Sequence, residues 1–177
     1  MKLFLVSGKA RHGKNTVSSM IREYYENKGL KVLETAFAKY IRMYAKELTP
    51  WDGCEDTKPR TLMQELGTDI IRKKLGKDDF FVRRMVEDIE IYQEFVDVVI
   101  ITDVRFPIEI DYVKKYYKDA IVINVKRINF NTNLTEEQQK HASEIALDNY
   151  TEFDYILTND TLEELKNDVN NMLDNIN

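Results

Sequence analysis

The chain has 177 residues, of which 43% are hydrophobic and 32% are charged, and its formal net charge is −5. This composition is typical of one globular domain over 1–177, and the acidic balance argues against a duplex nucleic acid as partner. The single cysteine excludes an intrachain disulfide, and no apolar run is long enough for a membrane-spanning helix or a signal peptide, so we expect a cytoplasmic protein.

Short apolar runs alternate with segments of helical periodicity along the whole chain. The first run, 3–7, ends at a glycine, and the segment after Lys14 places Val17 and Ile21 at helical spacing. The run 98–101 consists of Val-Val-Ile-Ile and is the clearest buried strand. The predicted strands are 3–7, 31–35, 95–102, 120–125 and 154–158, and the predicted helices are 14–27, 37–48, 59–75, 79–93, 108–117 and 162–176.

This alternation predicts an α/β fold in three layers, with a central, mainly parallel, five-stranded sheet and helices on both faces. The sequence contains no internal repeat and no Pro-rich or Gly-rich linker. We therefore predict one domain with a helical insert at about 37–94. The polar segment 128–140 is expected to be mobile or partly helical.

Residues 8–14 read Gly-Lys-Ala-Arg-His-Gly-Lys, which is the G-x-x-x-x-G-K pattern between a strand and a helix. The glycines permit backbone conformations that point successive N–H groups inward, and the helix after them offers its positive dipole end to an anion. Lys14 adds a charge between the β- and γ-phosphates of a nucleotide. The pattern predicts a P-loop NTPase fold, with ATP contacted by Gly8, Lys9, Arg11, His12, Gly13, Lys14, Asn15 and Thr16.

The position after the lysine departs from the usual pattern. Asn15 stands where a Ser or Thr normally binds Mg²⁺, and Thr16 follows it. Either residue, or a water, is expected to take this duty. For His12, a role in loop packing or phosphate contact is favoured over catalysis, because phosphoryl transfer needs little proton chemistry from the protein.

An acid and a base follow the central predicted strand. Asp103 stands directly after Thr102, and Arg105 lies two residues further on. In an open α/β sheet, ligands bind at the carboxyl ends of the strands. We expect Asp103 to hold Mg²⁺ or to accept a proton from the attacking oxygen. The alternative is a solvated aspartate at the end of a strand.

Four polar side chains follow one another at four-residue steps on the predicted helix 59–75. On a helix they form a slowly drifting row that could face a ligand, or simply face solvent. The row consists of Arg60, Gln64, Thr68 and Arg72.

The polar segment 127–145 is also a candidate for a lid over the nucleotide. Lys126 and Arg127 end the fourth predicted strand and would supply cations at the base of such a lid. A lid that closes over phosphates must exclude water, which would otherwise hydrolyse the nucleotide. The alternative is a plain surface loop.

Several of these segments together resemble the deoxynucleoside monophosphate kinases of the bacteriophage and bacterial P-loop group. The resemblance runs from residue 3 to about 170, and the segments 60–68 and 103–107 are its more specific parts. The matching segments are Gly8–Thr16, Arg60-x-x-x-Gln64-x-x-Gly67-Thr68, Thr102–Pro107, His141-x-Ser143-Glu144 and Asn159-Asp160.

The resemblance implies an adenylate-kinase-like fold with a lid, and transfer of the ATP γ-phosphoryl group to a (deoxy)nucleoside monophosphate. It implies that Gly13 and Lys14 hold the donor phosphates and that Asp103 serves the metal or the acceptor phosphate. The other implied roles are acceptor contacts for Lys39, Arg60, Gln64 and Arg105, donor-base or phosphate contacts for Arg127, and the base site for Asn159.

Two other functions remain open at this point. A related small-molecule kinase, for phosphomevalonate or dephospho-coenzyme A, would share the phosphate loop and differ in the acceptor pocket. A nucleotide-binding switch or assembly protein would keep Lys14 without turnover. The predicted helix 79–94 is also a candidate face for a homodimer.

Overall fold

Five parallel strands form the centre of this computed structural model, which describes residues 1–128 and 135–176. Their spatial order is β2-β3-β1-β4-β5, and every neighbouring pair is parallel, so the predicted mainly parallel sheet is in fact wholly parallel. Each strand coincides with a run that the sequence predicts. The strands are β1 (Lys2–Ser7), β2 (Val32–Thr35), β3 (Val98–Val104), β4 (Ile121–Lys126) and β5 (Tyr155–Thr158).

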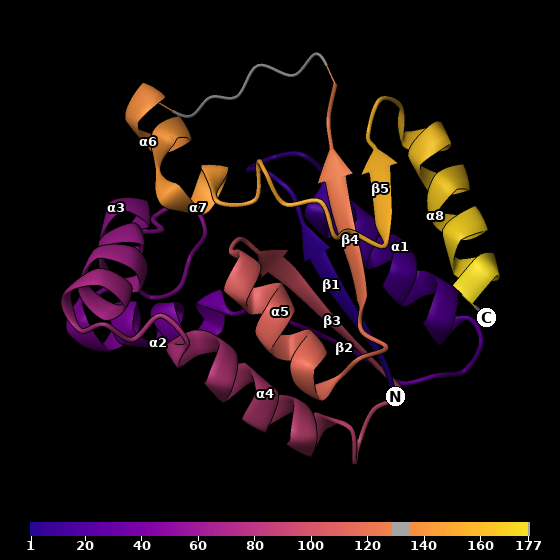
Figure 1. The fold of residues 1–177 in the computed structure, drawn as a ribbon, viewed down its shortest axis with the longest axis horizontal. Helices are drawn as coiled ribbons and strands as arrows, with labels where there is room; N and C mark the ends of the chain where they lie inside the picture. Colours follow the sequence, from indigo (N-terminus) through magenta and orange to yellow (C-terminus); the bar gives the residue numbers. More distant parts are fainter. Residues whose placement is uncertain (129–134, 177) are drawn as a thin grey trace.

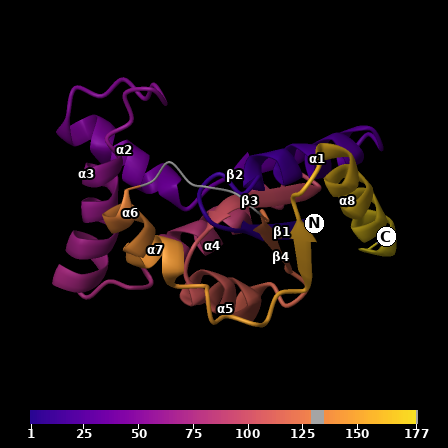
Figure 2. The ribbon, with the colours of Figure 1, turned by 90° about the horizontal axis from the view of Figure 1, so that it is seen from above.

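Helices cover both faces of this sheet and make the expected three layers (Figures 1 and 2). Helices α1 and α8 lie on one face, and α4 and α5 lie on the other. The helices are α1 (Lys14–Glu26), α2 (Ala38–Leu48), α3 (Arg60–Gln64), η1 (Glu65–Lys74), α4 (Phe80–Tyr92), α5 (Pro107–Tyr116), α6 (Glu136–Lys140), α7 (Ala142–Ile145) and α8 (Leu162–Ile176). None of these described helices is long and apolar enough to cross a membrane.

Strand β1 shows how the sheet separates two hydrophobic cores. Leu3 and Leu5 pack with α4 and α5, whereas Phe4 and Val6 pack with α1 and α8. Successive side chains of a strand point to opposite faces, so an uninterrupted apolar run satisfies both cores at once. The common direction of all five strands then brings their carboxyl ends to one edge, where the loop after β1 also lies.

The predicted helical insert divides into two parts. Helix α4 belongs to the core of the sheet, because Phe81 and Met85 are buried against β1 and β3. Helices α2, α3 and η1 instead extend beyond the sheet, as Figure 2 shows. Helices α2 and α3 share a small core around Trp51 and Met63, whereas Ile71 of η1 belongs to the larger core. The second part forms one wall of the site described below.

The helix predicted over 59–75 is present, but it is not a regular α-helix along its whole length. It is a short α-helix, α3, that continues as the ten-residue π-helix η1. Its hydrogen bonds reach five residues back, as from Leu75 N to Ile70 O at 2.9 Å, and such wide turns often mark functional sites. Periodicity gave no sign of this, because the apolar residues alone fit an α-helix equally well.

The end of β3 also differs from the prediction. The strand runs to Val104, so Asp103 lies within it and does not follow it. The pairing with β1 shifts register between Leu5 and Ser7, as at a bulge or a similar irregularity. Bulges re-aim side chains next to active sites, and this shift lies where the strand delivers Asp103 and Arg105.

Candidate active site

The loop between β1 and α1 adopts the backbone that the G-x-x-x-x-G-K pattern predicts. Gly8, Arg11 and Gly13 all have positive φ, at 144°, 63° and 105°. A Cβ on Gly8 would lie 2.5 Å from the carbonyl oxygen of Val125, and one on Gly13 would lie 2.3 Å from Nδ2 of Asn159. Both glycines are therefore required by conformation and by space, whereas Arg11 holds a left-handed conformation with a side chain attached.

Lys14 is buried at the start of α1 and folds back over this loop. Its Nζ donates to the carbonyl oxygens of Gly8 and Lys9, at 2.9 Å each. Burial, with a smaller contribution from the nearby Arg105 guanidinium, lowers the pKa of the Lys14 ammonium to about 7. The loop thus holds the Lys14 side chain where a bound anion would raise its pKa again and favour the charged ammonium.

The ends of β4 and β5 hold the loop from outside. The backbone N–H of Arg127 donates to Nδ1 of His12 at 3.2 Å, and Nδ2 of Asn159 donates to the His12 carbonyl at 3.0 Å. Burial and the charge of Lys14 lower the pKa of His12, which favours the neutral imidazole as acceptor. The structure therefore uses His12 for loop packing.

One cavity of about 960 Å³ lies in front of the loop and reaches α2, α3, η1, α7 and the end of β3. It brings together most of the predicted site residues, from both the donor and the acceptor side. These are Arg11, Gly13, Lys14, Asn15, Thr16, Arg60, Gln64, Thr68, Arg72, Asp103 and Arg105. Among the described residues, the cavity lining does not include Gly8, Lys9, His12, Lys39, Arg127 or Asn159.

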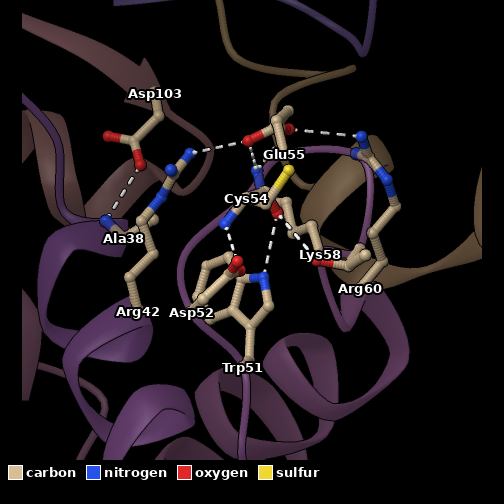
Figure 3. Close-up of polar contacts among 10 residues, drawn as sticks. Ala38, Arg42, Trp51, Asp52, Cys54, Glu55, Lys58, Arg60 and Asp103 are labelled. Carbon is tan, nitrogen blue, oxygen red and sulfur yellow. Dashed lines mark hydrogen bonds and ion pairs between the residues drawn. The ribbon is translucent and has the colours of Figure 1, made fainter.

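Asp103 joins the central strand to the acceptor wall. Its two carboxylate oxygens accept from the backbone N–H groups of Phe37 and Ala38, at 2.8 and 2.9 Å, at the start of α2. Figure 3 shows the contact with Ala38. Negative charge is favourable at a helix N-terminus, so Asp103 stabilises α2 while it lines the cavity. Asp103 is half-buried and bonded to two amides, so it is not a freely solvated side chain.

A buried ion pair fixes Arg72 in the cavity wall. Its Nη2 donates to Oε1 of Glu109 at 2.8 Å, and its guanidinium carbon lies 4.0 Å from the ring centre of Phe106 and 5.1 Å from that of Phe81. The side chains of Arg72 and Glu109 are 10% and 3% exposed, so the solvated-face alternative is wrong for this residue.

Glu109 also organises the strand end through its other oxygen. Oε2 accepts from the backbone N–H groups of Arg105 and Phe106, at 2.7 and 3.1 Å, at the start of α5. Burial raises the pKa of Glu109 to about 7, against the opposing effect of Arg72. Glu109 is not among the residues predicted from the sequence, although a proline at 107 followed by a glutamate in the first helical turn is a recognisable start signal.

Arg60 lies in a looser, more exposed corner of the cavity. The carboxylate of Glu55 contacts Lys58 at 2.9 Å, Arg60 at 3.3 Å and Arg42 at 3.7 Å (Figure 3). The hydrogen bond from Lys58 lowers the pKa of Glu55. Three cations around one carboxylate leave a positive excess, which suits a small anion. Sequence analysis singled out Arg60 alone among these residues.

Lys39 is placed away from the cavity. Its ammonium pairs with Asp88 and donates to the hydroxyl of Tyr92 at 2.6 Å, both on α4. The hydroxyl of Tyr40 donates to the same carboxylate at 2.5 Å. This network ties α2 to α4, which is a structural role that the position of Lys39 in the chain did not reveal.

Arg105 reaches across the cavity from the strand end to α7. Its Nη1 donates to Oε1 of Glu144 at 2.6 Å and to the carbonyl of Ser143 at 3.4 Å. The segment that carries the predicted lid thus contributes to the site through 142–145. The rest of the predicted lid lies partly outside the described residues, which omit 129–134.

The predicted metal residues Asn15, Thr16 and Asp103 share the cavity lining. Among the described residues, no group of three or more His, Cys, Asp or Glu side chains could hold a metal by itself. This donor set fits Mg²⁺, which typically binds one or two carboxylates plus waters and substrate phosphates. Each Asp103 oxygen keeps acceptor capacity beyond its one amide contact.

A known protein family matches the part of the chain that contains the acceptor wall and the end of β3. A sequence model of the family described as deoxynucleotide monophosphate kinase matches residues 34–169. The match begins after the phosphate loop, so the loop and the family match are separate observations. No curated protein sequence matches the chain.

Solved structures share the fold at low identity. A Thermus thermophilus protein named TT1252 has 17% identity and a TM-score of 0.56, over 99% of this chain and 98% of that chain. Shikimate kinase from Bacteroides thetaiotaomicron has 14% identity and a TM-score of 0.50, over 99% and 98%. At such identities the likeness concerns the fold alone, and it agrees with the expected three-layer, adenylate-kinase-like α/β architecture.

Proposed function

Because the chain belongs to the deoxynucleotide monophosphate kinase family, we propose that it transfers the γ-phosphoryl group of ATP, with Mg²⁺, to a (deoxy)nucleoside monophosphate in the cytoplasm. The single observation that carries the proposal is the shared cavity, which is lined by Lys14 of the phosphate loop and by Arg60, Arg72 and Arg105 opposite it. Its volume of about 960 Å³ is at the upper end of the usual range for ligand pockets, as two substrates require.

On the donor side, the nucleotide phosphates would replace the carbonyls of Gly8 and Lys9 as hydrogen-bond acceptors for Lys14 Nζ. The anion would also restore the full charge of the ammonium, whose pKa is about 7 without it. The N–H groups at the start of α1 add the positive end of the helix dipole. Binding of the donor thus replaces a contact within the loop by a stronger, charge-assisted one.

On the acceptor side, the cavity combines cations with apolar surface. Phe37, Met63 and Phe106 line it together with Gln64 and Thr68. A nucleoside monophosphate offers a flat base, hydrogen-bonding edges and a dianionic phosphate, and each of these meets a matching group in the wall. This combination supports a nucleotide acceptor over a purely polar metabolite.

Mg²⁺, when bound, would neutralise charge on the phosphates, with Asp103, Asn15 and Thr16 as its candidate protein contacts. The residues of the chain orient the two substrates for in-line attack. An oxygen of the acceptor phosphate forms the new bond to the γ-phosphorus as the bond to the β–γ bridging oxygen breaks and ADP leaves. Lys14 and Arg105 stabilise the negative charge, and the protein forms no covalent intermediate.

The test is ADP release from Mg·ATP with a panel of ribo- and deoxynucleoside monophosphates, and with shikimate as a structurally motivated comparison. We expect strong stimulation by one or a few deoxynucleoside monophosphates. Lys14→Met should lower turnover by about 10³-fold or more, because it removes a charge that acts on the transferring group.

Lys9→Met is the matched control for that substitution. Lys9 belongs to the same loop, but its ammonium is exposed and pairs with Asp148 at 2.8 Å. Its loss should change turnover about twofold at most. ATP binding without stimulation by any nucleotide would contradict the proposal and favour another small-molecule kinase or a nucleotide-dependent switch.

A further inference from the structure

The carboxylate of Glu144 accepts hydrogen bonds from two walls of the cavity. Its Oε2 accepts from the backbone N–H of Ala10, in the phosphate loop, at 2.9 Å. Its Oε1 accepts from Nη1 of Arg105, after β3, at 2.6 Å. The Glu144 side chain is only 10% exposed, so these contacts form where water competes weakly.

The contact with Glu144 determines which edge of Arg105 remains available. All described hydrogen bonds of this guanidinium pass through Nη1, to Glu144 and to the Ser143 carbonyl. Its Nε–H and Nη2–H edge has no hydrogen-bond partner among the described residues. That edge is a planar pair of donors with the spacing of two phosphate oxygens, and Arg105 lines the cavity.

Arg105 is also fixed at its backbone. Its N–H donates to Oε2 of Glu109 at 2.7 Å, so the main chain and the guanidinium are each held by a different carboxylate. An arginine has several rotatable bonds, and fixing both ends removes most of that freedom before a substrate binds. Glu144 adds a direct link from this arginine to the loop that holds the donor.

We propose that Glu144 is a positioning residue for phosphoryl transfer, which acts through Arg105 by holding its guanidinium against the phosphate loop. The inference rests on the proposed function and deepens it, because it states how a cation from β3 is aligned with donor phosphates bound by α1. The carboxylate does not touch the reacting atoms. Its effect is geometric, and misplacement by about 1 Å can cost about 10²-fold in rate.

A double-mutant cycle tests the action through Arg105. Glu144→Gln keeps the size of the side chain but leaves one acceptor oxygen for two donors, and Arg105→Lys keeps the charge but removes the planar donor pair. We expect Glu144→Gln to lower kcat about 10- to 100-fold with less than about threefold change in the KM for ATP. The double variant should match Arg105→Lys alone within about twofold, because one effect passes through the other.

Asp148→Asn is the matched control for charge. It removes one carboxylate four residues further along, from an exposed pair with Lys9 whose side chains are 47% and 42% exposed. Its kcat should stay within about twofold of wild type. If Glu144→Gln behaves like Asp148→Asn, or if the losses of the two variants multiply in the double variant, the inference is wrong.

A second measurement needs no activity. Hydrogen exchange at the Ala10 amide, followed by NMR without substrates, should be about tenfold faster in Glu144→Ala than in wild type and unchanged in Asp148→Asn. Unchanged exchange in a folded Glu144→Ala protein would overturn the inference. Absence of transfer in the wild-type protein overturns the proposed function and the inference with it, whereas transfer with multiplicative losses overturns the inference alone.

Discussion

The phosphate loop and the acceptor wall of this cavity are built in opposite ways. In the loop, Lys14 reaches carbonyls only five and six residues back, and backbone N–H groups are the donors expected for an anion there. In the wall, Arg72 meets Glu109 across 37 residues and Arg105 meets Glu144 across 39. A site made from local backbone can be recognised in a short motif, whereas one made from paired side chains depends on the whole fold.

The largest effect that separates the two regions should come from the wall. Arg72→Met leaves the Glu109 carboxylate buried without its counter-charge, which should lower the free energy of unfolding by about 3 kcal/mol at about pH 9. The pKa of Glu109 is already raised to about 7 and would rise further without Arg72. A raised carboxyl pKa means that stability is present at low pH and lost as pH rises through the folded pKa.

The difference between Arg72→Met and wild type should therefore grow as pH rises above about 7. Urea titrations across this range measure it. The control is Arg72→Met combined with Glu109→Gln, which has no buried carboxylate and keeps an oxygen for the amides at the start of α5. We expect this pair to recover stability and to lose the pH dependence; a double variant less stable than Arg72→Met would contradict the buried-charge explanation.

The loop should respond to backbone changes instead. Gly13→Ala introduces a Cβ at a φ of +105° and 2.3 Å from Asn159 Nδ2, which also holds the His12 carbonyl. We expect a loss of about 2 kcal/mol in the free energy of unfolding, from backbone strain and a broken hydrogen bond.

Gly29→Ala is the control that separates backbone strain from the broken hydrogen bond. Denaturant unfolding of both variants measures the two losses. Gly29 has a φ of +77°, but a Cβ there meets nothing within 4 Å. Strain alone should cost about 1 kcal/mol. Equal losses in the two variants would show that the contact with Asn159 contributes nothing.

A further effect concerns the charge of the loop lysine, Lys14. The pKa of Lys14 is lowered to about 7 by burial, and a bound phosphate favours the charged form, so binding takes up a proton above that pH. The affinity for ADP, measured by calorimetry, should fall by up to about tenfold per pH unit from about pH 7 to pH 9.

Lys14→Arg is the control for this titration, because a guanidinium stays charged over the whole range. Its ADP affinity should vary less with pH than that of the wild type, and the nucleotide's own ionisation is common to both proteins. A parallel fall in both proteins would mean that Lys14 does not titrate in this range.

The same contrast between local backbone and long-range side-chain contacts explains which features could be predicted from the sequence. The five strands follow from apolar runs and are confirmed, although β3 ends at Val104, and the loop after β1 has the backbone that the motif predicts. For Asp103 the motif indicates the correct edge of the sheet, but its two amide partners belong to a helix that starts 65 residues earlier. Lys39 has no local sign that Asp88 would take its charge, and the π-helical turn leaves the apolar pattern unchanged.

The contact between Asp103 and α2 has a mechanical consequence. Both oxygens hold the first amides of that helix, so this end is anchored to the sheet. Helix α2 has 11 residues and is therefore about 16 Å long. We expect a rotation of about 10° about the anchored end to move the far end by about 3 Å, which would shift the acceptor wall while the strand end beside Lys14 stays still.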